Sequence, residues 1–306
     1  MSSLRSTLLN KFLRTTLNRG WQPDMDITSL RRRMSAAALF NRRPAKYSVL
    51  TAPCCPVDYV NADDSDQSLT LLYFHGGAFC WHDAPMYRGF VKRLCQKIGA
   101  SGYLPDYRLA PEYPFPAAVN DCLETYRWLL QQPGINPQQL VIAGDSAGGS
   151  LLLTTLMQAR DQGLPLPACA VALCPFADAT GSGSSVVENA ERDVMFTPEA
   201  LGAVMQFYLS ESGQRTDPLV SPLLGDLQGL PPLLLQVGEP ELLRDDSVRL
   251  AEKIVQAGGE VKLHVWDDMP HTFQLISWLP EGKQAIQEFV DFVQKYTGEI
   301  SAQKIS

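Results

Sequence analysis

A serine flanked by glycines stands at residues 144–148, Gly-Asp-Ser-Ala-Gly, directly after the apolar run 140–143. Because a second apolar run begins at Leu151, the pattern predicts a buried strand, a tight turn and a helix, the arrangement of a nucleophile elbow. Such a turn brings the residues two before and two after Ser146 close together, so both must be nearly free of side chain. The turn would hold the Ser146 hydroxyl clear of the sheet, where it can act as a nucleophile.

The loop after an earlier apolar run could supply hydrogen-bond donors. His-Gly-Gly-Ala at residues 75–78 follows directly on the run 69–74. Small residues let a substrate carbonyl approach backbone N–H groups, which is what stabilising a developing oxyanion requires. A plain turn at the end of a strand is the simpler interpretation, but the apolar residues 79–81 that follow favour a pocket wall.

A serine nucleophile needs a base, and the chain has four histidines. His75 belongs to the loop just described, His82 follows close to it, and His264 falls inside a predicted strand. His271 lies in Asp-Asp-Met-Pro-His, just past the last predicted strand at residues 261–266. Active sites of open α/β sheets gather at the carboxyl ends of strands, so we predict that His271 is the base.

The carboxylate that orients this base is expected after the predicted strand 233–237. Four acidic residues lie there, Glu239, Glu241, Asp245 and Asp246. The residue pattern by itself does not choose among them. Any of the four gives the same order along the chain, which is serine, acid, histidine.

The elements that would position these residues alternate between strands and helices. The predicted strands cover residues 47–51, 57–61, 69–74, 102–106, 140–143, 171–174, 233–237 and 261–266. Helical patterns separate them from the third strand onward, so we expect an α/β fold with a doubly wound, mostly parallel sheet. Residues 178–216 interrupt this alternation, and residues 1–48 form helical patterns that the sheet does not need.

These motifs together resemble the hormone-sensitive-lipase-like esterases of the α/β-hydrolase superfamily, of the Gly-Asp-Ser-Ala-Gly type. The resemblance covers roughly residues 69–275 and is carried by the segments 75–78, 106–112, 144–148, 229–232 and 269–271. It implies an α/β-hydrolase fold with a helical cap. The implied activity is that of a serine carboxylesterase that forms an acyl-enzyme on short- to medium-chain esters, with acyl groups of about two to eight carbons.

The resemblance also implies roles for single residues. In the family the acid stands four residues before the aspartate of a Leu-Arg-Asp-like segment, which selects Glu241 here. The implied oxyanion donors are the N–H groups of Gly77, Ala78 and Ala147, with Gly76 shaping the loop. Ala78 departs from the usual third glycine of this loop but keeps the N–H group. The resemblance implies no cofactor and no metal.

The expected organisation has two cap segments and two core segments. Residues 1–48 would form N-terminal cap helices and residues 178–216 a cap insertion, while residues 49–177 and 217–306 would form the hydrolase core. The first helix is amphipathic, and we expect its apolar residues Leu4, Leu8, Phe12 and Leu13 to be buried against the body.

Composition narrows the class of protein further. The 306 residues are 45% hydrophobic and carry a net charge of −7, so the chain is an ordinary globular protein with no reason to expect nucleic acid as a partner. No apolar run approaches the roughly 20 residues needed to span a bilayer. Seven cysteines without C-x-x-C spacing, and the lack of a secretory pattern, favour reduced thiols, no metal and a cytoplasmic location. The sequence leaves a homo-oligomer open.

Charge is uneven along the chain. Residues 1–50 carry ten Lys/Arg and two Asp/Glu, a net charge of +8 that leaves −15 for the rest. We interpret this asymmetry as a separate N-terminal layer that faces an acidic body, with contact to an anionic surface as the alternative.

Two other functions remain compatible with the sequence. An amidase, a deacetylase or an arylformamidase would use the same three residues. A non-hydrolytic protein could bind a small ligand on the same scaffold, as some relatives do after losing the catalytic histidine. The presence of His271 and a complete oxyanion loop argue for the ester hydrolase.

Overall fold

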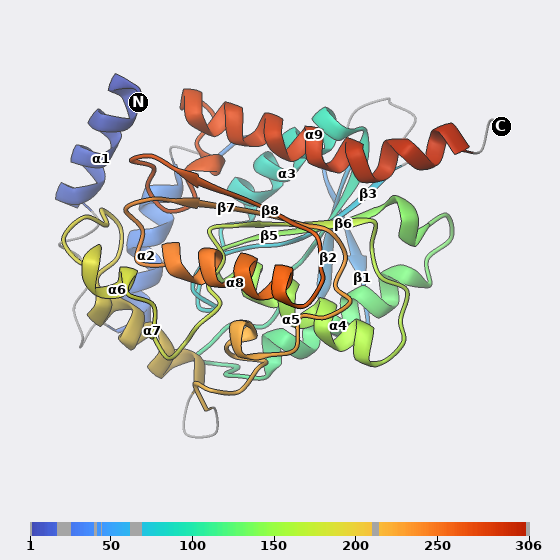
Figure 1. The fold of residues 1–306 in the computed structure, drawn as a ribbon, viewed down its shortest axis with the longest axis horizontal. Coiled ribbons are helices and arrows are strands. Elements are labelled where there is room, and N and C mark those ends of the chain that lie inside the picture. Colours follow the sequence, from blue (N-terminus) through green and yellow to red (C-terminus); the bar gives the residue numbers. More distant parts are fainter. Residues whose placement is uncertain are drawn as a thin grey trace.

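The computed structural model describes residues 2–16, 26–39, 42–43, 45–61, 69–209 and 214–303. Its centre is an eight-stranded sheet with the order β1-β2-β4-β3-β5-β6-β7-β8 (Figure 1). The strands are β1 (Ser48–Thr51), β2 (Pro56–Asn61), β3 (Leu69–Phe74), β4 (Ala100–Pro105), β5 (Leu140–Asp145), β6 (Cys169–Leu173), β7 (Leu233–Gly238) and β8 (Val261–Trp266). Strand β2 runs antiparallel to both β1 and β4, and the other pairs are parallel. The predicted α/β-hydrolase fold with a mostly parallel sheet is confirmed.

Helices cover both faces of this sheet. In Figure 1, α3 (Ala84–Ile98) and α9 (Pro280–Gln303) lie on one face, and α4 (Ala117–Leu130), α5 (Ala147–Asp161) and α8 (Arg244–Gln256) lie on the other. Each face has its own apolar core. The central strands β3, β5, β6 and β7 are buried at every position, which is why they read as continuous apolar runs rather than as alternating patterns.

The strand register brings distant loops to one edge of the sheet. Phe74 at the end of β3 pairs with Gly144 in β5, and Gly238 at the end of β7 pairs with Trp266 at the end of β8. Because these strands are parallel, the segments that leave their carboxyl ends meet at the same edge. Among the described residues, short 3-10 helices lie in connecting segments at η3 (Pro137–Gln139), η4 (Pro222–Leu224) and η5 (Phe273–Leu275).

Four further helices gather at one end of the molecule, on the left in Figure 1. They are α1 (Leu4–Thr16), α2 (Ile27–Ala38), α6 (Ser185–Glu188) and α7 (Pro198–Leu209). Two of them belong to residues 1–48 and two to residues 178–216. None of the helices in the described ranges combines the length and the apolar character that a membrane crossing requires.

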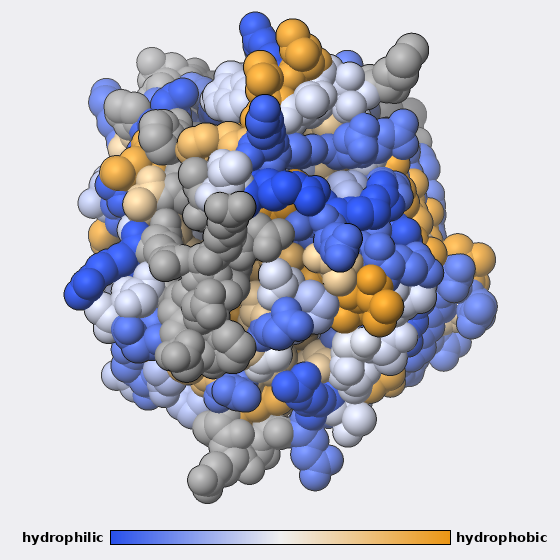
Figure 2. Space-filling model, turned by 90° about the vertical axis from the view of Figure 1, so that its left-hand side faces the viewer, coloured by the Kyte–Doolittle hydropathy of each residue, from blue (hydrophilic) through white to orange (hydrophobic). Residues whose placement is uncertain are grey.

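The side of α1 that faces solvent is not the polar side that the sequence predicts. Leu4, Leu8 and Phe12 are 77%, 60% and 53% exposed, whereas Ser6 and Leu9 are buried. Figure 2 views this end of the molecule and shows hydrophobic side chains among hydrophilic ones at the surface. The prediction that Leu4, Leu8 and Phe12 are buried is therefore wrong.

Polar contacts on the inner side of α1 explain this difference. The Ser2 hydroxyl donates to Asp268 Oδ2 at 2.9 Å, and Asn10 Nδ2 donates to the Asp268 carbonyl at 2.8 Å. The Ser3 N–H donates to Glu281 Oε1 at 2.6 Å. These bonds fix the rotation of the helix about its axis, which apolar spacing alone did not show.

Candidate active site

Ser146 sits at a strained turn between β5 and α5. Its φ of 54° and ψ of −120° are unusual for a residue with a side chain. Its N–H donates to the Leu173 carbonyl at 2.9 Å, and its carbonyl accepts from the Phe176 N–H at 3.1 Å, so the turn is fixed from the neighbouring strand. A side chain at Gly148 would clash with the carbonyl of Phe74, so glycine is required at this position. The structure thus contains the predicted strand, turn and helix.

His271 and Glu241 form a buried pair. His271 Nδ1 lies 2.6 Å from Glu241 Oε2, and the other carboxylate oxygen accepts the Gly238 N–H at 2.5 Å. Because the carboxylate can only accept, Nδ1 carries the proton and Nε2 is left free to act as a base. Among the described residues, Nε2 is buried without a hydrogen-bond partner. It is therefore available to a substrate or to Ser146, which lines the same cavity as His271.

The surroundings of His271 favour its charged form. Burial by itself lowers the pKa of His271, but the charge and hydrogen bond of Glu241 outweigh that effect and raise the pKa above its ordinary value. The carboxylates of Asp193 and Asp145 add to this increase. An imidazole that takes a proton from serine needs such stabilisation of its charged form.

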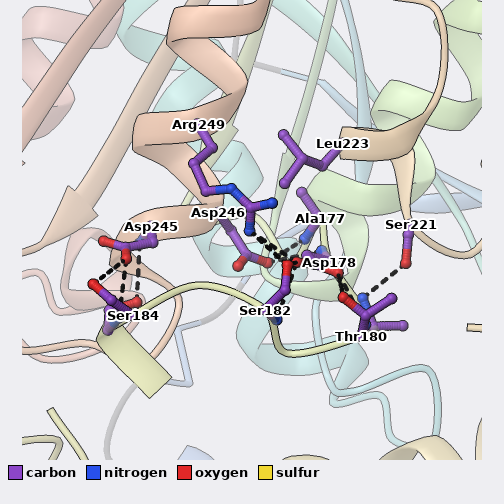
Figure 3. A network of polar contacts seen from close by, with 12 residues as sticks. Ala177, Asp178, Thr180, Ser182, Ser184, Ser221, Leu223, Asp245, Asp246 and Arg249 are labelled. Atoms are coloured by element: carbon purple, nitrogen blue, oxygen red, sulfur yellow. Dashed lines mark hydrogen bonds and ion pairs between the residues drawn. The ribbon is translucent and has the colours of Figure 1, made fainter. Parts of the chain in front are cut away.

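The other three candidate acids have different partners. Glu239 forms a surface ion pair with Arg192 at 2.5 Å. Asp245 accepts from the Ser184 hydroxyl at 3.0 Å, and Asp246 accepts the N–H groups of the segment 177–178 (Figure 3). Of the four carboxylates, the structure brings only Glu241 to His271.

The loop at residues 75–78 lies beside the serine, at the end of β3. Gly77 has a φ of 114°, and a side chain there would clash with the Trp81 carbonyl. Ala78 also has a positive φ of 56°, which alanine tolerates at some cost in strain. Gly77 and Ala78 line one cavity with Ser146, and Ala78 and Ala147 line a second cavity with it. Gly77, Ala78 and Ala147 thus line the same space as the serine, and Gly76 precedes them in the loop.

Asp145 ties this loop to the serine turn. Its Oδ1 accepts the Gly76 N–H at 3.0 Å and the Tyr73 hydroxyl at 2.8 Å, and its Oδ2 accepts the Tyr87 hydroxyl at 3.0 Å. Burial raises the pKa of Asp145, and these three hydrogen bonds oppose the increase. The fully buried side chain therefore holds two parts of the site in register.

The buried side chain of His75 packs against the loop at residues 75–78. Its ring is stacked between His82 at 3.9 Å and Tyr107 at 4.1 Å, and its Nδ1 lies 2.7 Å from the Gly76 carbonyl. Burial lowers the pKa of His75 well below its ordinary value, so the ring is neutral.

His75, His82 and Asp106 are close enough to suggest a metal site, but the planes of the two histidine rings are inclined by only 6°. Their in-plane lone pairs run parallel instead of converging, so they do not suit a common metal ion.

Comparison with known proteins places the chain in a family. The family described as alpha/beta hydrolase fold matches residues 71–275. The chain belongs to the α/β-hydrolase fold family. An acetyl-hydrolase of Streptomyces hygroscopicus is 39% identical to this hydrolase over 82% of this chain and 83% of its own. An esterase of Acinetobacter venetianus is 37% identical over 72% and 73%, respectively. An ethyl acetate hydrolase of Pseudomonas putida is 31% identical over 79% and 78%.

Solved structures agree with this placement. An esterase/lipase from an uncultured bacterium has a TM-score of 0.90 at 37% identity, covering 97% of this hydrolase and 100% of its own chain. An esterase from the bacterial hormone-sensitive lipase family has a TM-score of 0.89 at 35% identity, covering 97% and 99%. The resemblance to hormone-sensitive-lipase-like esterases and the class of carboxylic ester hydrolases, both predicted from the sequence, are confirmed.

Sequence reasoning missed two buried groups of this hydrolase that contact the candidate site. Asp193 accepts the N–H groups of Met195, Phe196 and Leu242 at 2.8, 3.0 and 2.9 Å, which joins the segment before α7 to the segment carrying the acid. Phe196 in turn meets the His271 ring edge-on, with centroids 5.1 Å apart. No sequence signal marks Asp193, because its role arises from contacts between distant segments.

Cys174 is the second group that sequence reasoning missed. It follows β6 directly, has a φ of 48°, and its sulfur accepts the Thr272 N–H at 3.3 Å. Burial, together with the nearby Glu241 carboxylate, raises the pKa of Cys174 well above its ordinary value, so the group stays a thiol. The rule that sites form at the carboxyl ends of parallel strands could have singled out this position.

Proposed function

We propose that the protein is a serine carboxylesterase that hydrolyses short- to medium-chain esters through an acyl-enzyme. Ser146 is the nucleophile, His271 the general base and acid, and Glu241 the residue that orients His271. One observation carries the proposal: the free Nε2 of the buried His271–Glu241 pair and the serine of a strained turn line the same cavity. The names of the relatives, esterase and acetyl-hydrolase, support the same activity.

The reaction has two halves. Ser146 Oγ attacks the ester carbonyl while His271 Nε2 takes its proton, and Glu241 stabilises the resulting imidazolium. The N–H groups of Gly77, Ala78 and Ala147 stabilise the oxyanion of the tetrahedral intermediate. His271 then returns the proton to the leaving alkoxide. A water molecule, activated by the same histidine, attacks the acyl-enzyme and releases the acid.

Residues 1–48 and 178–216 act in this proposal as a cap over the catalytic groups. The cavity that holds Ser146 and His271 has a volume of about 160 Å³. Apolar side chains from both segments line it, among them Leu13, Met34, Met195 and Phe196. Such walls exclude water and strengthen the electrostatic interactions on which the oxyanion depends.

Covalent labelling tests the proposal at its nucleophile. A fluorophosphonate probe modifies only a serine that a base activates, so the native protein should be labelled and Ser146→Ala should not. Ser150→Ala is the matched control, because Ser150 is a buried serine one turn further along α5 and should leave labelling unchanged. An unlabelled native protein, or a labelled Ser146→Ala, would overturn the proposal and favour a ligand-binding role. Release of p-nitrophenol from p-nitrophenyl acetate then separates an esterase from an enzyme restricted to amides.

A further inference from the structure

Helices α3 and α9 lie on the same face of the sheet (Figure 1) and form the walls of a second cavity. Its volume is about 350 Å³, compared with about 160 Å³ for the cavity at Ser146. Small-molecule sites have volumes of roughly 300–1,000 Å³. Ile276 lines both cavities, whereas Ser146 and His271 line only the one at the serine. The second cavity is therefore large enough for a ligand and lies outside the proposed catalytic residues.

The floor of this cavity is apolar. Phe90 and Leu94 lie one turn apart on α3, and both belong to the same buried cluster as Ile286 of α9. Gly282 lets α9 approach the segment after η5 closely, since a side chain there would lie 3.0 Å from the Ile276 carbonyl. An apolar part of a ligand can therefore be buried here.

The rim of the cavity carries positive charge. Arg93, Lys97 and Lys283 line it, and no carboxylate of the described residues does. Arg93 is half-buried, and its Nη2 donates to the Leu275 carbonyl at 3.0 Å. Within the described ranges none of these three side chains forms an ion pair. Their charges are thus not balanced by the protein around them.

Carboxylates of the neighbouring elements are bound elsewhere. Helix α3 contains no acidic residue. On α9, Glu281 accepts the Ser3 N–H at 2.6 Å, and Glu288 pairs with Lys262 at 2.6 Å. Burial lowers the pKa of Arg93, and the nearby charge of Arg43 lowers it further. A half-buried guanidinium among other cations is costly, and a bound anion would offset that cost.

We propose that this cavity binds a carboxylic acid with an apolar chain, in its ionised form. The planar guanidinium of Arg93 can hold the carboxylate through two parallel hydrogen bonds, and Lys97 and Lys283 add charge at the rim. The apolar floor takes the chain, which distinguishes this ligand from a small inorganic anion. The proposal is independent of the proposed hydrolysis, because the cavity contains none of the residues assigned to that reaction.

Calorimetric titration with sodium octanoate at constant ionic strength tests the charged half of the site. Arg93→Met keeps most of the length of the side chain and removes its charge, so the dissociation constant for octanoate should rise at least tenfold. Arg127→Met is the matched control, because Arg127 is also a half-buried arginine on a helix but lies on α4, across the sheet. It should change the constant less than about twofold. No measurable binding of octanoate to the native protein, or equal binding to Arg93→Met, would overturn the proposal.

Two further ligands test the halves of the site separately. The neutral 1-octanol keeps the chain, and inorganic phosphate keeps the charge, so each should bind at least tenfold more weakly than octanoate. Phosphate that binds as tightly as octanoate would overturn the role of the apolar floor.

A variant at the serine cavity decides where octanoate binds. His271→Gln should retain octanoate binding, since His271 does not line the second cavity. Binding that is lost in His271→Gln but kept in Arg93→Met would place octanoate beside Ser146 and overturn the proposal. Should Arg93→Met lose its fold by circular dichroism, the exposed Lys97 provides the second variant, and Lys97→Met should weaken octanoate binding about threefold. Unchanged binding to a folded Lys97→Met would then count against the site.

Discussion

Two regions line the cavity at Ser146: the edge of the sheet that carries the proposed catalytic residues, and the proposed cap of residues 1–48 and 178–216. The contacts that hold them differ. At the edge of the sheet, buried hydrogen bonds of the Glu241 carboxylate hold His271, and those of the Asp145 carboxylate hold the loop at residues 75–78. The N-terminal part of the proposed cap instead places apolar side chains in the cavity and is attached partly through exposed ion pairs, such as Arg31 with Glu112 at 2.6 Å. Exposed pairs of this kind contribute about 0–1 kcal/mol each. Buried hydrogen bonds tolerate little change in geometry, whereas apolar walls tolerate replacement. We therefore expect changes at the edge to affect kcat and changes in the cap to affect KM and selectivity.

Removal of the nucleophile or the base should have the largest effect. Ser146→Ala and His271→Ala should each lower kcat by a factor on the order of 10⁶, because the triad acts as a unit. The free energy of unfolding should change little for Ser146→Ala. Steady-state kinetics on p-nitrophenyl acetate, with urea unfolding alongside, measure both quantities. A loss of less than about tenfold in kcat for either variant would contradict the assigned roles.

Substitution of the proposed acid, Glu241, should have the second-largest effect on kcat. Glu241→Gln keeps the size of the side chain but removes its charge, and kcat should fall by a factor on the order of 10⁴. Because Glu241 raises the pKa of His271, the acidic limb of the remaining kcat/KM profile should move to lower pH. Glu239→Gln is the matched control and should change kcat less than about twofold, since this side chain pairs with Arg192 at the surface. An active Glu241→Gln beside an inactive Glu239→Gln would show that the acid is misassigned.

The contact between α8 and the start of the segment 178–216 should make the stability of the protein depend on pH. Asp246 of α8 accepts the N–H groups of Ala177 and Asp178 at 2.6 and 3.0 Å, just where the second cap segment begins (Figure 3). Burial raises the pKa of Asp246 to about 7, with Asp178 adding to the increase and Arg249 opposing it. The folded state therefore binds a proton that the unfolded state has lost above about pH 4.

Stability should consequently fall as the pH rises through the interval from about 4 to 7. This group alone should lower the free energy of unfolding by about 3 kcal/mol between pH 5 and pH 8. Asp246→Asn retains an oxygen that can accept both N–H groups and removes the titration, so its unfolding free energy should depend less on pH. Urea unfolding at several pH values measures the difference. Equal slopes for the two proteins would mean that Asp246 ionises normally.

The smallest effect should come from α1. Leu13 lines the cavity that holds Ser146 and His271, whereas Leu8 on the same helix is 60% exposed. Leu13→Ala should raise KM for p-nitrophenyl acetate about threefold to tenfold with kcat almost unchanged, because one apolar contact in a cavity is worth about 1 kcal/mol. Leu8→Ala should leave both constants within about twofold. Equal effects of the two substitutions would show that α1 influences the site through its packing as a whole.

The sequence predicted those parts of the site that depend on local pattern. The turn at Ser146 and the loop at residues 75–78 were recognisable because their geometry requires small residues at fixed spacing. His271 followed from the rule on strand ends. The acid did not follow from residue pattern, because four carboxylates lie within eight residues and the fold of that segment decides which one faces the histidine. The family resemblance was needed to select Glu241.

Contacts between distant segments were beyond such reasoning. Asp193 and Cys174 lie beside the acid only because the segments after β6 and β7 converge. The rotation of α1 depends on polar bonds to Asp268 and Glu281, more than 250 residues away along the chain. Apolar spacing identified the helix but not the face that it turns toward the body.

The order of the proposed catalytic residues along the chain has a consequence for biosynthesis. Ser146 and the loop at residues 75–78 are translated long before Glu241 and His271, which stand on either side of β8. With the proposed roles, a nascent chain that ends before β8 holds the nucleophile Ser146 but lacks the base His271. Esterase activity becomes available only when the last strand has joined the sheet, so recovery of activity during refolding reports completion of the whole sheet rather than of its first half.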